Sequence, residues 1–114
     1  GILMEKAKYI WMDGKLVPWD KASVHILTHT LHYGNGVFEG TRAYQTDNGL
    51  AVFRLKDHTK RLLNSAKITM IKSPYSQEEL EEAQIKLLKS NDFKSNVYIR
   101  PLIYLGYGVM GLYH

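Results

Sequence analysis

The sequence predicts an α+β domain in two layers, a mainly antiparallel sheet with two amphipathic helices packed on one face. Short alternating runs rich in strand-forming residues dominate, turn residues separate them, and only two segments space their apolar residues as a helix does. The chain has 114 residues, of which 45% are hydrophobic and 23% charged, as is typical of one globular domain. We therefore expect helices over a sheet and no second domain within this length.

Two hairpins are expected in the first half of the chain. Residues 9–17 surround Asp13-Gly14, a pair that readily adopts the positive φ angles of a two-residue turn. Residues 36–46 alternate between apolar and polar, and Asp47-Asn48-Gly49 separates them from a short apolar strand at 50–54. We expect all four strands to lie in one antiparallel sheet.

Two amphipathic helices are expected at residues 56–69 and 76–91. Asp57 is placed to cap the first turn of the earlier helix, and Ser76 begins a capping box in the later one. The apolar stripes consist of Leu55, His58, Leu62 and Ala66 in the first helix and of Leu80, Ala83, Leu87 and Leu88 in the second. Residues 97–105 then read as a strand that completes the sheet.

Strand alternation predicts a face on which aromatic and basic side chains gather. It groups Tyr98, Arg100, Leu102 and Tyr104 in the last strand, and Phe38, Gly40, Arg42 and Tyr44 in the second hairpin. Gly40 leaves a notch beside an aromatic ring, which can admit a substrate. The pattern fits a ligand-binding wall, and it equally fits a half-exposed sheet face with ordinary aromatic and arginine pairs.

Arg61 is a second candidate binding residue. It lies one helical turn beyond His58, at the rim of the apolar stripe. A guanidinium at this place can bind a phosphate or a carboxylate through two parallel hydrogen bonds. It can also form a salt bridge with Asp57 or with a neighbouring glutamate, and spacing alone does not decide between these alternatives.

Several other kinds of site are not expected. His25, His29 and His32 lie close together, but no acidic residue stands between them and HExxH is absent, so we expect no metal site. The chain has no cysteine, which excludes thiolate metal sites and a cysteine nucleophile. The glycines at 34–40 run into a strand instead of opening a helix, so they do not form a dinucleotide loop.

Charge and hydropathy argue against nucleic-acid and membrane partners. Fifteen basic and eleven acidic residues give a net charge of +4, and the lysines are scattered along the chain. The apolar runs are far shorter than the roughly 20 residues of a membrane helix. We expect a cytoplasmic protein. The alternative from another class is a non-enzymatic domain that binds anions or nucleic acid through Arg42, Arg54, Arg61 and Arg100.

Three blocks of the sequence resemble the signature of branched-chain amino acid aminotransferases. They are HTLHYGNGVFEGTRAY at residues 29–44, VFRLKDH at 52–58 leading into Arg61-Leu62 and Ser65-Ala66-Lys67, and YIRPL at 98–102. The resemblance implies the N-terminal domain of the D-amino acid aminotransferase-like fold, with pyridoxal 5'-phosphate as cofactor. D-amino acid aminotransferases and aminodeoxychorismate lyases share the GVFE part and stay as alternatives within the class.

The same resemblance implies roles for individual residues. Arg61 would bind the cofactor phosphate, and Arg100 would receive the second carboxylate of glutamate. The implied substrate pocket is lined by Phe38, Gly40, Tyr98 and Arg100, together with Tyr33 and Leu112 reaching in from the partner subunit of a homodimer or a multiple of dimers. Phe38, Tyr33 and Leu112 would form the apolar wall that accepts leucine, isoleucine or valine.

The resemblance also implies a second domain that carries the Schiff-base lysine. No lysine of this chain stands in the family's lysine motif, so we assign no catalytic residue here. We expect residues 4–114 to be the N-terminal, smaller domain of an aminotransferase, residues 1–3 to be left over from expression, and the cofactor-lysine domain to be absent. The parent enzyme would move amino groups between branched-chain amino acids and 2-oxoglutarate, and the chain alone is expected to be inactive.

Overall fold

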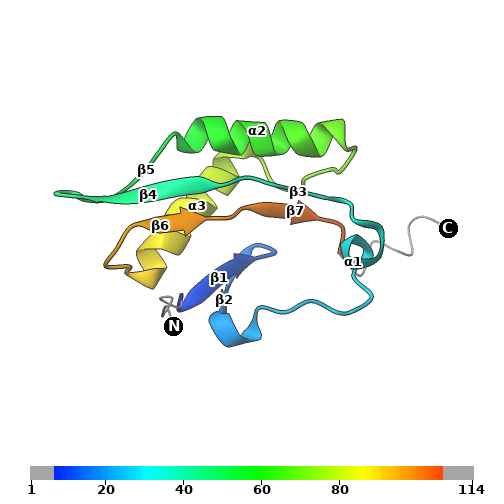
Figure 1. Cartoon of the computed structure of the whole chain (residues 1–114), viewed down its shortest axis with the longest axis horizontal. Coiled ribbons are helices and arrows are strands. Elements are labelled where there is room, and N and C mark those ends of the chain that lie inside the picture. The colour runs from blue at the N-terminus through cyan, green and yellow to red at the C-terminus, as the bar shows by residue number, and fades with distance from the viewer. Residues whose placement is uncertain (1–6, 107–114) are drawn as a thin grey trace, which may run out of the picture.

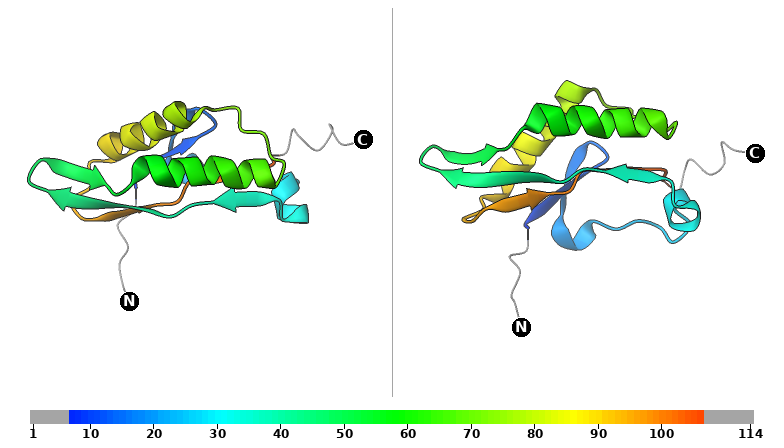
Figure 2. Two further views of the ribbon diagram at one scale, coloured as in Figure 1. Left: turned by 90° about the horizontal axis from the view of Figure 1, so that it is seen from above. Right: turned by 45° about the horizontal axis from the view of Figure 1, so that its top comes forward.

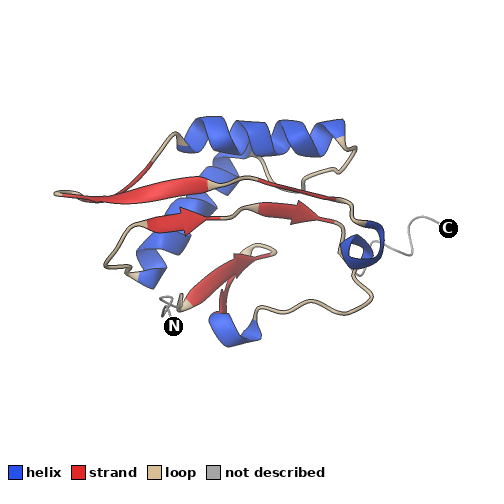
Figure 3. Ribbon diagram, viewed as in Figure 1, coloured by secondary structure: helices blue, strands red, loops and turns tan. Residues whose placement is uncertain are grey.

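The computed structural model describes residues 7–106, and it confirms the α+β architecture (Figure 1). The strands are β1 (Tyr9–Met12), β2 (Lys15–Pro18), β3 (Gly36–Phe38), β4 (Thr41–Thr46), β5 (Gly49–Val52), β6 (Val97–Ile99) and β7 (Leu102–Tyr104). The helices are α1 (His29–Tyr33), α2 (Leu55–Ile68) and α3 (Gln77–Asn91), with a 3₁₀ turn at Trp19–Lys21. The two long helices begin and end within one residue of the predicted bounds. Figure 3 separates these helices from the strands by colour.

The two longest predicted strands are each interrupted once. β3 pairs with β7 and β4 with β6, all antiparallel and in one continuous register that places Phe38 opposite Leu102 and Thr41 opposite Ile99. Between the two ladders the Glu39 N–H donates to the Pro101 carbonyl at 3.0 Å. Proline has no N–H with which to return the bond, so the ladder stops there. The predictions of single strands at 36–46 and 97–105 were wrong for this reason.

The first hairpin forms a sheet of its own, so the prediction of a single sheet was also wrong. β1 pairs only with β2 across a turn in which Asp13 and Gly14 have φ angles of 51° and 88°. The edge of β1 meets the side chain of Asn91, at the end of α3. Asn91 Oδ1 accepts from the Lys8 and Tyr9 N–H groups at 2.6 and 2.8 Å, and its Nδ2 donates to the Tyr9 carbonyl at 3.1 Å.

Asn91→Ala is expected to detach this hairpin from α3. The substitution removes the partners of three backbone groups of Lys8 and Tyr9, at the start of β1, and Asn91 itself is only 4% exposed. We expect a loss of about 2–3 kcal/mol in the free energy of unfolding, measured by urea denaturation. Ser90→Ala, which removes a hydrogen bond confined to the neighbouring helical turn, is the matched control and should cost much less. Equal stability of the two variants would contradict the docking role of Asn91.

Both long helices pack on the same face of the strands, as predicted. α2 covers β3 and β7 through the cluster of Val37, Leu62, Ala66 and Ile71 with Ile103 and Leu105. α3 covers β4 and β6 through Ala43, Leu88 and Ile99 with Leu50, Val52, Phe93 and Val97. Seen from above in Figure 2, both helices lie on one side of the strands. No helix of residues 7–106 covers the opposite face, which we call the helix-free face.

The two helix starts differ in how they are capped. Ser76 forms the predicted capping box, because its side chain accepts from the Glu79 N–H while Glu79 accepts from the Ser76 N–H. The predicted cap by Asp57 was wrong, because α2 begins two residues earlier, at Leu55. Asp57 instead receives a hydrogen bond from Arg54 Nε at 2.8 Å, within the first turn. No helix in residues 7–106 is long and apolar enough to cross a membrane.

Candidate active site

The helix-free face of the strands collects exposed aromatic and apolar side chains. Phe38, Tyr98 and Leu102 are 60%, 53% and 55% exposed, which is unusual for residues of this size. Their neighbours Val37 and Ile99 are buried on the helix side. The alternation predicted from the sequence is thus confirmed for these strands, and it leaves an apolar surface open to a ligand or to another part of the protein.

Arg100 is held in the middle of this face by two rings. Its guanidinium carbon lies 4.3 Å from the centre of the Phe38 ring and 5.2 Å from that of Tyr98. Its Nη2 donates to the Tyr98 hydroxyl at 2.8 Å. No carboxylate within residues 7–106 pairs with Arg100. The face therefore offers an oriented positive charge in apolar surroundings, which suits an anionic group on an otherwise apolar ligand.

The notch predicted at Gly40 is filled by the chain itself. A Cβ atom placed on Gly40 would overlap the Tyr98 hydroxyl, which lies where the side chain of any other residue would be. The expectation that this notch is open to a substrate is therefore corrected. Continuing the register of β4 and β6, Gly40 lies opposite Arg100. The Tyr98 hydroxyl reaches Arg100 by lying over the Gly40 backbone, so only glycine leaves enough room there.

Gly40→Ala is expected to displace the Tyr98 hydroxyl and break its hydrogen bond to Arg100. The phenol end of a side chain can move, so the free energy of unfolding should fall by no more than about 1 kcal/mol. The Arg100 guanidinium should then become mobile, because it loses its bond to Tyr98. The exchange of the Arg100 guanidinium N–H signals with water, followed by NMR, measures this. Signals unchanged from the wild type would mean that Tyr98 does not orient Arg100.

Arg61 forms a bidentate ion pair with Glu39, not with Asp57. Arg61 Nε donates to Glu39 Oε2 at 2.7 Å and Nη2 donates to Oε1 at 2.6 Å. Glu39 lies in the interruption between β3 and β4, and its side chain is 7% exposed, whereas that of Arg61 is 66% exposed. The alternative of a salt bridge to a glutamate is therefore present. This salt bridge uses only the Nε and Nη2 edge of the guanidinium. Nη1 makes no hydrogen bond within residues 7–106.

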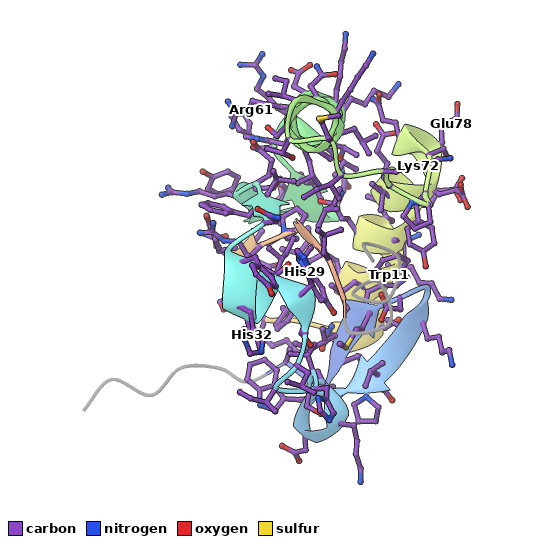
Figure 4. The ribbon with its side chains drawn as sticks, turned by 90° about the vertical axis from the view of Figure 1, so that its right-hand side faces the viewer. Trp11, His29, His32, Arg61, Lys72 and Glu78 are labelled. Atoms are coloured by element: carbon purple, nitrogen blue, oxygen red, sulfur yellow. The ribbon has the colours of Figure 1, made fainter. Side chains whose placement is uncertain are left out.

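The ion pair holds Arg61 where Glu39 interrupts the pairing between the strands. Figure 4 shows Arg61 reaching out from α2 on the side opposite to α3, the side toward which the open face of the strands is turned. His29 and His32 lie at α1, away from Arg61, so these side chains do not converge on one point. Neighbouring elements thus carry the partly exposed Arg61 guanidinium and the exposed aromatic side chains of the helix-free face.

Two neighbours keep Glu39 ionised. The hydrogen bonds from Arg61 lower the pKa of the Glu39 carboxyl from 4.5 to about 2, against the opposing effect of burial. His58 adds to the shift, with Nδ1 lying 3.0 Å from Oε1 as a donor. The same contacts raise the pKa of Arg61. The pair is therefore fully charged at every pH at which the protein would work.

The low pKa of Glu39 predicts that the free energy of unfolding decreases in acid. Its pKa is lower in the folded state, so its contribution is complete above the unfolded value of 4.5 and disappears as the pH falls toward 2. We expect the free energy of unfolding to decrease over this window. Unfolding of Glu39→Gln, measured in parallel, should lack that part of the decrease. An identical acid profile for the two proteins would contradict the assigned ion pair.

Tyr33 lies on α1, which is fastened to the end of β7. Thr30 Oγ1 accepts from the Leu105 N–H at 2.8 Å, and the Thr30 N–H donates to the Leu105 carbonyl at 3.1 Å. Tyr33 is 63% exposed and its ring lies 4.5 Å from that of His29. It is separate from the Arg100 face. Leu112, the other residue predicted to reach a partner subunit, lies outside the described residues.

Two of the three neighbouring histidines serve the local structure. His32 Nε2 lies 2.8 Å from the Ile26 carbonyl, and His25 Nδ1 accepts from the Leu27 N–H at 3.0 Å. Across residues 7–106 no group of three or more histidine, cysteine, aspartate or glutamate side chains is arranged to hold a metal ion. These contacts give His25 and His32 a role in the loop before α1.

Sequence reasoning missed Glu39 as part of this site. Alternation alone places Glu39 on the buried face of its strand. A buried carboxylate requires a partner, and this requirement could have indicated an ion pair. The partner could not be identified, because Arg61 lies 22 residues away on a helix whose rotation about its axis depends on packing. The hydrogen bond between Tyr98 and Arg100 was likewise not predicted.

Comparison with known proteins identifies the class. The family of class IV amino-transferases matches residues 36–111, and the chain belongs to this family. It is 52% identical over 103 residues to a branched-chain-amino-acid aminotransferase of Pseudomonas aeruginosa, which is 90% of this chain and 33% of that protein. It is 45% identical over 108 residues to the enzyme of the same name from Escherichia coli K12, covering 95% of this chain and 35% of the relative.

Solved structures agree with the sequence comparison. The branched-chain amino acid aminotransferase of Escherichia coli has a TM-score of 0.84 at 46% identity, covering 89% of this chain and 33% of that one. The T.th. enzyme complexed with N-(5'-phosphopyridoxyl)-L-glutamate has a TM-score of 0.86 at 48% identity, covering 91% and 34%. The chain thus spans about a third of the length of these relatives.

Proposed function

We propose that this chain is part of a pyridoxal-phosphate-dependent transaminase that moves the amino group between leucine, isoleucine or valine and 2-oxoglutarate. The observation that carries the proposal is the helix-free face, on which an oriented arginine without an acidic partner in residues 7–106 stands among exposed Phe38, Tyr98 and Leu102. Such a surface suits both a branched apolar side chain and a second carboxylate. Similarity to enzymes named for this reaction supports it.

The residues divide the work between the two kinds of substrate. Phe38 supplies apolar contact for a branched side chain, and Arg100 binds the distal carboxylate of glutamate. Tyr98 orients Arg100, and Gly40 gives Tyr98 its room. Structures of the T.th. relative contain N-(5'-phosphopyridoxyl)-L-glutamate in one case and 4-methylvaleric acid in another. The glutamate part of the first ligand has two carboxylates, and the second has one carboxylate on a branched apolar chain.

Arg61 fits the phosphate of the cofactor. Its exposed Nη1 makes no hydrogen bond within residues 7–106, while the rest of the guanidinium is fixed by Glu39. Pyridoxal phosphate, when bound, supplies the electron sink for breaking bonds at the substrate's α-carbon. This chain contributes binding and orientation, and the lysine that attaches the cofactor belongs to another part of the proposed enzyme.

We further propose that residues 4–114 are the N-terminal domain of a cytoplasmic homodimer, or multiple of dimers, in which Tyr33 and Leu112 reach the partner's pocket. The 114-residue chain alone is expected to show no transaminase activity and no single lysine labelled by pyridoxal phosphate and borohydride. Mass spectrometry after reduction tests this. Stoichiometric labelling at one lysine would contradict the assignment of the cofactor lysine to another domain.

The decisive experiment for the proposed reaction is donor specificity of the full-length protein. With 2-oxoglutarate as acceptor, L-leucine, L-isoleucine and L-valine should be used with far higher kcat/KM than D-alanine. No pyruvate should be released from aminodeoxychorismate. A preference for D-alanine, or release of pyruvate, would instead identify one of the two related class IV activities.

A further inference from the structure

The Glu39 carboxylate connects the interrupted strand ladder to α2. It stands between β3 and β4, next to the position where Pro101 stops the pairing, and both of its oxygens receive N–H groups of Arg61. A carboxylate that is 7% exposed is tolerated only with such partners. Two parallel hydrogen bonds also fix the plane and the direction of the guanidinium, which a single bond would not do.

Without this contact Arg61 would be free to move. Its side chain is 66% exposed, and within residues 7–106 Arg61 donates its short hydrogen bonds to Glu39. An exposed arginine samples many rotamers, so the conformational entropy lost on ordering it weakens the binding of an anion. If a carboxylate orders the arginine side chain before the anion arrives, the anion binds a rigid hydrogen-bond donor and this entropy loss is avoided. The effect is therefore on binding and is separate from the packing of α2.

We infer that Glu39 is a positioning residue, which holds the guanidinium of Arg61 so that its Nη1 edge is presented to the cofactor phosphate. This inference rests on the proposed function of Arg61. Glu39 contacts the Nε and Nη2 edge, so the guanidinium separates its charge from an anion at Nη1.

The low pKa of Glu39 is consistent with a permanent positioning role. With its pKa lowered to about 2 by Arg61 and His58, the carboxylate does not change charge near neutral pH. The charge of the pair therefore does not vary near neutral pH, as a preorganised donor requires.

Glu39→Gln in the full-length apoenzyme tests this role. The amide places an NH₂ group against the arginine, so at most one of the two hydrogen bonds can persist. Titration should give roughly tenfold weaker binding of pyridoxal phosphate, the size expected for the freedom of one arginine side chain. Binding of pyridoxal, which has no phosphate, should be unchanged. The control Asp57→Asn breaks the exposed pair with Arg54 on the same helix and should alter neither.

Three outcomes separate this inference from the proposed function. Equal or tighter binding of pyridoxal phosphate by folded Glu39→Gln overturns the positioning role, as does an equal loss for pyridoxal. If the variant does not fold, the wild-type Arg61 Nε–H signal in NMR decides, because it should exchange slowly with water and fast exchange overturns the inference. If Arg61→Ala binds pyridoxal phosphate normally, the proposed cofactor role itself fails.

Discussion

Arg61→Ala in the full-length enzyme is expected to weaken the binding of pyridoxal phosphate by roughly ten- to a hundredfold, the range for a lost charge-assisted contact. The proposed contact is to the phosphate, which takes no part in bond breaking, so kcat at saturating cofactor should change less. Fluorescence titration of the apoenzyme measures the affinity. The variant also leaves the buried Glu39 without its main partner, so the free energy of unfolding should fall as well.

Two controls separate phosphate binding from this loss of stability. Pyridoxal, which lacks the phosphate, should bind the wild type and Arg61→Ala equally well. Arg54→Ala removes another arginine of the same helix region whose partner, Asp57, is exposed, and should leave the cofactor affinity unchanged. Parallel losses for pyridoxal and pyridoxal phosphate would show that Arg61 acts through the fold and not through the phosphate.

Arg100→Ala should discriminate between the two kinds of amino donor. Only glutamate and 2-oxoglutarate carry a second carboxylate, so their KM values should rise by one to two orders of magnitude while that of leucine changes little. Loss of the cation that stacks on Phe38 and Tyr98 leaves the apolar wall in place. Cofactor affinity should be preserved, because Arg61 is untouched.

Arg42→Ala is the matched control for Arg100. It removes an exposed arginine from the same face of the ladder, opposite Tyr98, without breaking the bond between Tyr98 and Arg100. A general effect of positive charge on acidic substrates would appear in both variants. Equal weakening of leucine and glutamate in Arg100→Ala would mean that Arg100 binds the common α-carboxylate or supports the sheet.

The sequence predicted the features that depend on local pattern. Alternation placed Phe38, Tyr98 and Arg100 on one face, and the capping box at Ser76 located the start of α3. Both follow from backbone geometry over a few residues, which does not depend on the rest of the fold. The same holds for the turn at Asp13-Gly14, where positive φ angles select the residues.

Features that depend on distant partners were not predicted. The ladder breaks because Pro101 lies opposite Glu39, a pairing known only once the register of two segments more than 60 residues apart is fixed. The first hairpin is separate from the other strands, and the Asn91 side chain of α3 binds the backbone at the start of β1 instead. Gly40 was taken as an open notch because nothing local reveals that the Tyr98 hydroxyl fills it. Each case is a tertiary contact that overrides a correct local pattern.

The proposed reaction can be followed directly as a pair of half-reactions in the full-length protein. After loading with pyridoxal phosphate, a stoichiometric addition of L-leucine should convert the bound cofactor to its pyridoxamine form, followed by absorbance. Addition of 2-oxoglutarate should then restore the starting spectrum and yield glutamate. This result would show one pocket that accepts both a branched apolar and a dicarboxylic substrate. Conversion by D-alanine but not by L-leucine, or no return with 2-oxoglutarate, would contradict the account.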